Sequence, residues 1–125
     1  MLTLTILPNR FTIHRLAVGT PLPPEIWGSA FYAITQTADE LSVVAEESIP
    51  FISSEQSQLD WLAFKVMGPL DFSLTGILAR LSHVLAEANI SIFAISTFDT
   101  DYILVKAEHE AAATAALRQA NYIVL

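Results

Sequence analysis

The strongest constraint on the fold comes from a helix-forming segment that ends at about Ala88. Its apolar side chains recur three or four residues apart, or at multiples of that spacing, at Leu74, Ile77, Leu78, Leu81, Leu85 and Ala88. This spacing places them on one stripe of an amphipathic helix, which must pack against another element. Ser73 is a suitable N-cap for this helix, and Asn89 followed by Ile90 predicts a left-handed C-terminal cap. The segment is therefore predicted to be a long helix with one buried face.

Strand-like segments surround this helix in the second half of the chain. The predicted elements are a strand at 61–67, the helix, strands at 90–98 and 102–106, an alanine-rich helix at 108–120 that Asn121 ends, and a strand at 122–125. The order β-α-β-β-α-β is the ferredoxin-like pattern, which predicts one four-stranded sheet with both helices on one face.

The first half repeats this pattern in a degenerate form. Strands are predicted at 2–6, 11–16, 31–37 and 41–46, with a proline-rich loop at 19–24, a short helix at 24–27 and one helical turn at 53–56. A shift of 61 residues lays 32–35 on 93–96 and 41–44 on 102–105, which favours two related units. We therefore predict an α+β chain of two ferredoxin-like units with antiparallel sheets and helices on one face, divided into 1–59 and 60–125.

Composition argues against several classes of protein. Of the 125 residues, 53% are apolar and 15% are charged, and the net charge is −7. A chain this apolar is not expected to be disordered, and its six scattered basic residues form no patch for nucleic acid. No apolar run approaches the roughly 20 residues of a membrane-spanning helix, and no signal peptide is recognised at the start. The lack of cysteine fits a reducing cytoplasm, and the high apolar content predicts a homodimer.

Residues suited to catalysis or metal binding do not cluster in the sequence. The histidines His14, His83 and His109 fall in three different elements, with no second histidine or carboxylate at metal-ligand spacing. No nucleophile elbow, phosphate-binding loop or dinucleotide fingerprint is present. We therefore expect no catalytic residue, no metal and no cofactor, and a chain that is not an enzyme.

The loop Gly68–Gly76 is the candidate binding site. A short strand-to-helix loop directs several free backbone N–H groups toward one point, which suits a carboxylate or a phosphate. The alternative is an ordinary connection that binds nothing, because Gly-Pro commonly joins a strand to a helix. Turn chemistry explains Asp71 and Asp99. Asp101, in contrast, enters a strong strand, where aspartate is disfavoured, and its carboxylate could pair with a ligand's ammonium group.

Three long segments of this sequence resemble the small bacterial tandem ACT-domain proteins. The segments are 62–78, 92–106 and, for the hairpin of the first unit, 31–44. The chain is more distantly similar to the CASTOR arginine sensors of animals. ACT domains are regulatory modules that bind small molecules, most often amino acids, where units meet. The resemblance therefore implies a regulatory protein that binds an amino acid without catalysis.

The resemblance also implies which residues contact the ligand. The loop before the helix would receive the ligand's carboxylate, and the neighbouring hairpin would contact its amine or side chain. The implied residues are Asp71, Ser73, Leu74, Thr75, Gly76, Ile77, Ser96, Thr97, Phe98 and Asp101. The commonest ACT loop reads Asp-x-Pro-Gly, from which this sequence departs, and the first unit lacks the loop, so at most one site per chain is expected. The acidic charge favours a cationic ligand side chain, and the alternative function is an assembly domain that associates with proteins without a ligand.

Overall fold

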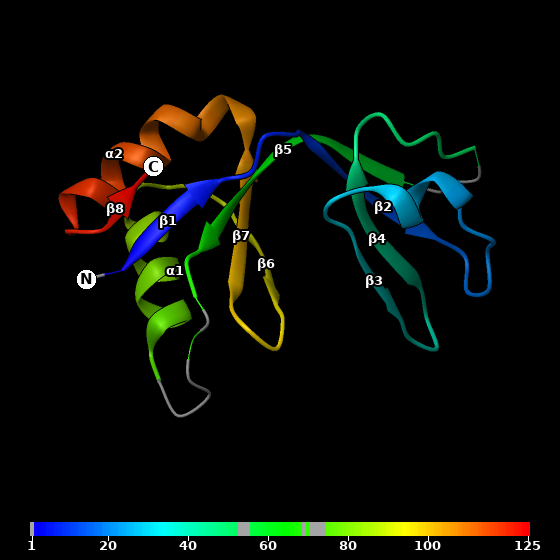
Figure 1. The fold of residues 1–125 in the computed structure, drawn as a ribbon, viewed down its shortest axis with the longest axis horizontal. Helices are drawn as coiled ribbons and strands as arrows, with labels where there is room; N and C mark the ends of the chain where they lie inside the picture. Colours follow the sequence, from blue (N-terminus) through cyan, green and yellow to red (C-terminus); the bar gives the residue numbers. More distant parts are fainter. Residues whose placement is uncertain (1, 53–55, 69, 71–74) are drawn as a thin grey trace. The chain divides into compact units, whose positions relative to one another are not determined.

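The computed structural model describes residues 2–52, 56–68, 70 and 75–125, and these form two compact units (Figure 1). One unit, called the C-terminal unit below, combines the segment that ends at Pro8 with Leu62–Leu125. The other unit is Asn9–Trp61, which holds most of the predicted first unit and is called the second unit below. This grouping differs from the predicted division at residues 59 and 60, because the first strand packs with the C-terminal unit. The helical turn predicted at 53–56 lies outside the described residues except for Gln56, which begins a strand.

The C-terminal unit is an α+β fold with a mixed sheet, which confirms the predicted fold class. Its elements are β1 (Thr3–Ile6), the second half of β5 (Gln56–Val66), α1 (Ile77–Glu87), β6 (Phe93–Ser96), β7 (Asp101–Lys106), the 3-10 turn η2 (Ala107–His109), α2 (Glu110–Gln119) and β8 (Ile123–Val124). The described strands lie in the order β6-β7-β5-β1-β8. The prediction of a four-stranded antiparallel sheet was wrong in two respects, because β1 lies between β5 and β8 as an additional strand and pairs parallel with β8.

The inserted strand β1 contributes to the core of this unit. It runs antiparallel to β5, with Leu4 opposite Val66, and parallel to β8, with Leu4 opposite Val124. All three side chains are buried, so the inserted strand extends the apolar face of the sheet. Both helices cover that face: the core cluster contains Leu81 of α1 and Leu117 of α2 together with sheet residues.

Helix α1 ends as predicted but begins later. Ile77, Leu81 and Leu85 form its buried face. Asn89 has a φ of 59°, and the N–H of Ile90 donates to the Leu85 carbonyl at 2.9 Å, which confirms the left-handed C-terminal cap.

The beginning of α1 corrects the predicted cap. The N-cap is Gly76, which has a φ of 78° and is followed by Ile77 as the first helical residue, so the prediction that Ser73 caps the helix was wrong. A left-handed conformation at Gly76 interrupts the helical path, and glycine adopts it without steric cost. Leu74, predicted to be helical, lies outside the described residues.

The second unit has a smaller core and no long helix among its described residues. Its elements are β2 (Phe11–Leu16), the 3-10 helix η1 (Pro24–Gly28), β3 (Ala33–Gln36), β4 (Leu41–Glu46) and the first half of β5. These strands lie in the order β3-β4-β2-β5, and each neighbouring pair is antiparallel. Leu16, Ile26 and Val43 lie at the centre of its core.

The hairpins of the two units correspond at a shift of 60 residues. Ala33 lies opposite Val44 in the β3–β4 hairpin, and Phe93 lies opposite Leu104 in the β6–β7 hairpin. The predicted shift of 61 was therefore wrong by one residue. A slip of one residue exchanges the two faces of a strand, and the similar residue types on neighbouring positions concealed that exchange in the sequence.

Candidate functional site

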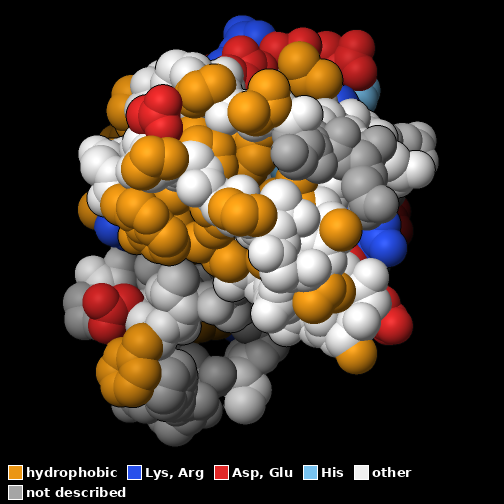
Figure 2. Space-filling model, turned by 90° about the vertical axis from the view of Figure 1, so that its right-hand side faces the viewer, with side chains coloured by type: hydrophobic (Ala, Val, Ile, Leu, Met, Phe, Trp, Pro, Cys, Tyr) orange, Lys and Arg blue, Asp and Glu red, His pale blue; other side chains and the backbone are white. Residues whose placement is uncertain are grey.

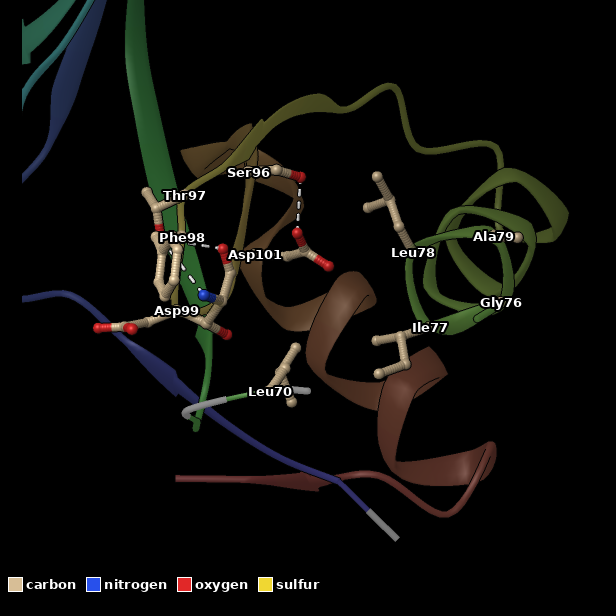
Figure 3. A pocket seen from close by; sticks show the side chains of 11 residues that line it. Leu70, Gly76, Ile77, Leu78, Ala79, Ser96, Thr97, Phe98, Asp99 and Asp101 are labelled. Carbon is tan, nitrogen blue, oxygen red and sulfur yellow. Dashed lines mark hydrogen bonds between the residues drawn. The ribbon is translucent and has the colours of Figure 1, made fainter. Parts of the chain in front are cut away.

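A hollow of about 310 Å³ opens between the first turn of α1 and the tip of the β6–β7 hairpin (Figure 3). Leu70, residues 76–79 and residues 96–101 line it. All of them belong to the C-terminal unit. The hollow therefore lies where the sequence placed the ligand, between the start of the helix and the neighbouring hairpin.

The structure brings together most of the described residues that were predicted to form the site. Gly76, Ile77, Ser96, Thr97, Phe98 and Asp101 line the hollow. Thr75 instead lines a second hollow beside α1, together with Arg80 and His83. Asp71, Ser73 and Leu74 lie outside the described residues. Five further residues line the first hollow but were not among the named ligand contacts, although Leu70 lies in the candidate loop: Leu70, Leu78, Ala79, Asp99 and Thr100.

Hydrogen bonds within the hairpin fix the shape of its tip. The N–H of Thr97 donates to the Thr100 carbonyl at 2.8 Å, and the N–H of Thr100 lies 3.3 Å from the Thr97 hydroxyl. Asp and Thr are common in such turns because their side chains bond nearby backbone groups. The tip is therefore a closed turn held by its own backbone and by Thr97.

Two further hydrogen bonds join this tip to the end of β5. The buried hydroxyl of Thr100 donates to the Val66 carbonyl at 2.6 Å, and the N–H of Leu70 donates to the Asp99 carbonyl at 2.7 Å. The two segments approach so closely that a Cβ on Gly68 would lie 3.1 Å from the Asp99 carbonyl oxygen. Only glycine fits there without a shift of the backbone.

Two polar side chains of the site lie side by side on the hairpin. Ser96 and Asp101 are cross-strand partners, and the Ser96 hydroxyl donates to Oδ1 of Asp101 at 2.6 Å. In Figure 3 both side chains point from the hairpin toward α1. A carboxylate has two oxygens and can accept further hydrogen bonds.

The opposite wall of the hollow is the N-terminus of α1. The first helical hydrogen bond runs from the Arg80 N–H to the Gly76 carbonyl at 2.9 Å, and the N-cap makes no side-chain hydrogen bond. In an α-helix the N–H groups before that bond, here those of Ile77, Leu78 and Ala79, have no acceptor within the helix. They carry partial positive charge. The hollow thus has a negative carboxylate on one side and a positive helix end on the other.

The histidines lie elsewhere and do not suggest catalysis at this hollow. His14, in the second unit, stacks on Phe51 with ring centroids 3.9 Å apart, and its Nδ1 lies 3.1 Å from the Ser57 hydroxyl. Burial lowers the pKa of His14 below its ordinary value. His83 pairs weakly with Glu87 at 3.9 Å, four residues further along the helix, so the expectation that no histidine has a carboxylate at metal-ligand spacing was wrong for His83. His109 pairs weakly with Glu108 at 3.8 Å. Within the described part of the chain, no group of three histidine, aspartate or glutamate side chains could hold a metal ion.

Comparison with known proteins establishes the family of this chain. The ACT domain family model matches residues 56–119, more than half of the chain, and an N-terminal-domain model matches residues 9–51. The chain therefore belongs to the ACT domain family.

Relatives of known sequence or structure agree with this assignment. The human protein CASTOR3P is 33% identical over 87 residues, which cover 60% of this chain and 53% of that protein, so the chain spans about half the length of this curated relative. A crystal structure from Agobacterium tumefaciens is 33% identical with a TM-score of 0.88, over 99% of this chain and 92% of that one.

A more distant structure shares the fold. The regulatory subunit of aspartate kinase from Thermus thermophilus, in its ligand-free form, has 12% identity and a TM-score of 0.63, over 93% of this chain and 95% of that one. Among the residues that the structure describes, no helix is long and apolar enough to cross a membrane.

Proposed function

We propose that this chain is a non-catalytic, cytoplasmic regulatory protein that binds a free α-amino acid in the hollow between α1 and the β6–β7 hairpin. The observation that carries the proposal is the Asp101 carboxylate facing the first turn of α1 (Figure 3). A free amino acid is a zwitterion, with a carboxylate and an ammonium group on one carbon. The N–H groups of Ile77 and Leu78 would receive the carboxylate, and the Asp101 carboxylate would receive the ammonium group.

The size of the hollow and the family of the chain support this assignment. A volume of about 310 Å³ lies at the small end of ligand cavities, which suits a molecule of amino-acid size. The ACT domain match and the fold shared with a regulatory subunit of aspartate kinase both favour regulation over catalysis. Regulation requires that the ligand bind two states of the protein with different affinity.

The proposal includes a homodimer as the assembly that the ligand would influence. Strands β3 and β6 each pair on one side only within the described sheet, and Trp27 and Phe98 are exposed. Apolar side chains gather on the face shown in Figure 2. Closed two-fold pairs are the commonest way to cover such surfaces. Sedimentation at micromolar concentration should give a dimer, and a monomer would contradict this part of the proposal.

A thermal-shift screen against the twenty amino acids tests the binding function. A ligand at about 100 times its dissociation constant should stabilise the protein by about 2.7 kcal/mol. If no amino acid raises the midpoint temperature of unfolding, the alternative of an assembly domain without a ligand is favoured.

Substitution of Gly76 by valine tests whether the amino acid that raises the unfolding temperature binds in this hollow. A Cβ at Gly76 would meet no atom within 4 Å, so the cost comes from the φ of 78°, which a β-branched residue tolerates poorly. Gly76→Val should abolish the ligand shift while the protein remains folded. Gly28→Val is the matched control, because its Cβ also meets no atom within 4 Å and it lies in the second unit. Global unfolding of Gly76→Val alone would assign the loop a structural role.

A further inference from the structure

We infer that the ligand's side chain is apolar and of medium length, rather than cationic; this inference rests on the proposed amino-acid function. The lining of the hollow carries it. Two features are decisive: the position of the acidic groups and the side chains that surround the remaining space.

The acidic groups of the described lining leave no partner for a second cation. The carboxylates among these residues are those of Asp99 and Asp101. Asp101 already accepts the Ser96 hydroxyl and faces the ligand's ammonium group. In Figure 3 the Asp99 carboxylate points away from the space in front of α1, and its backbone carbonyl accepts the Leu70 N–H. Among the residues that the structure describes, a lysine or arginine side chain would therefore lose water without gaining an opposite charge, which disfavours binding.

Apolar side chains line the described part of the hollow next to α1. Figure 3 shows Leu70, Ile77 and Leu78 directed toward the region in front of the Ser96–Asp101 pair. Ile77 belongs to the core cluster, and Leu70 and Leu78 are partly buried against it. A ligand side chain that reaches this region extends the core, and each methylene removed from water strengthens binding about fourfold.

The net charge of −7 favours a cationic ligand over long distances, but it does not decide the preference within the hollow. Exposed charges are largely screened beyond about 8 Å at physiological salt. Contacts inside the hollow are shorter than this, so the local lining determines which side chain is accepted.

Norleucine and lysine provide the matched test, because lysine is norleucine with an ammonium group at the end of the side chain. Isothermal titration of both ligands at equal ionic strength should show norleucine binding at least tenfold more tightly. Hexanoate, which lacks the α-ammonium group, should bind much more weakly than norleucine if Asp101 receives that group. Equal or tighter binding of lysine would overturn the inference while leaving the amino-acid function intact. Absence of binding by any amino acid would overturn both.

A charge introduced at Leu78 should reverse the preference. Leu78→Glu places a carboxylate in the apolar part of the hollow and in the first turn of α1, where an acidic residue favours the helix. This variant should bind lysine more tightly than norleucine. Ala86→Glu adds the same charge at an exposed position of α1 outside the hollow and should keep the original preference. If Leu78→Glu fails to fold by circular dichroism, the comparison on the unmodified protein still decides the question. Reversal in both variants would show that net charge, not the lining, sets specificity.

Discussion

Replacement of Thr100 by valine tests whether the hairpin tip is held to the rest of its unit as the structure indicates. Thr100 is 5% exposed, and its hydroxyl donates to the Val66 carbonyl at 2.6 Å across 34 positions of sequence. Valine has nearly the same shape, so the variant removes the hydroxyl without opening a cavity. The loss of a partner for a buried polar group costs about 1–3 kcal/mol, and we expect the free energy of unfolding to fall by that amount.

The contacts that remain define what the variant should preserve. The hydrogen bonds between Thr97 and Thr100 use the backbone of Thr100, so the turn itself should persist. What weakens is the attachment of the turn to β5, next to Leu70 and the hollow. The affinity for an amino acid should therefore fall together with stability, because the wall formed by the hairpin would be less well positioned.

Urea unfolding monitored by fluorescence measures the effect, with Thr100→Ser as the matched control. Serine keeps the hydroxyl and should retain most of the stability that valine loses. Hydrogen exchange at the Leu70 amide, which donates to Asp99, should accelerate in the valine variant more than in the serine variant. A valine variant within about 0.5 kcal/mol of the unmodified protein, or a serine variant equally destabilised, would refute the reasoning.

Two further predictions concern the cores of the two units. Burial lowers the pKa of His14 below its unfolded value of about 6.5, so the unfolded chain binds a proton more readily. The free energy of unfolding should be highest above pH 6.5 and fall as the pH decreases toward the folded pKa of His14. Urea unfolding at pH 5.5 and 7.5 measures this difference, and His14→Gln should make it smaller. Leu81→Ala removes a fully buried side chain of α1 and should lower the unfolding free energy by about 2–5 kcal/mol, whereas Arg80→Ala on the exposed face should change it little.

The sequence predicted the features that local chemistry decides. Asparagine tolerates left-handed backbone, and both Asn89 and Asn121 adopt it where the helices end, with φ values of 59° and 71°. The start of α1 was harder to locate, because serine and glycine are both acceptable N-caps and Ser73 and Gly76 lie three residues apart. The left-handed conformation at Gly76 decides between them, and the sequence does not encode it uniquely.

Features that depend on distant segments could not be predicted in the same way. The pattern of β1 indicated a strand, but its position between β5 and β8 depends on which partners bury Leu4. Among the residues that line the hollow, some have a local sequence signal and others do not. Asp101 was identified because aspartate is unusual at a strand entry. Thr100 was not, because its bond to Val66 has no local signature.

At the shift of 60 residues, the Ser96–Asp101 pair of the hollow has no equivalent in the second unit. At that shift the positions of Ser96 and Asp101 are occupied by Gln36 and Leu41, so the second unit has no carboxylate at the place that would receive an ammonium group. In the second unit, the segment between β2 and β3 takes the place in the chain order that α1 has before β6. This segment bonds directly to the β3–β4 hairpin, because the N–H of Gly19 donates to Oε1 of Gln36 at 2.9 Å.

The tips of the two hairpins also differ in the group that bonds to them. The Asp39 carbonyl, equivalent to that of Asp99, accepts the guanidinium of Arg15 at 3.2 Å, whereas the Asp99 carbonyl accepts the backbone N–H of Leu70. The Asp39 carbonyl is therefore bound by a side chain, while the equivalent carbonyl of Asp99 is bound by the backbone next to the hollow. Leu41 is buried and carries no carboxylate, so the second unit has no group equivalent to Asp101 that would receive an ammonium group. We therefore propose at most one ligand of this kind per chain.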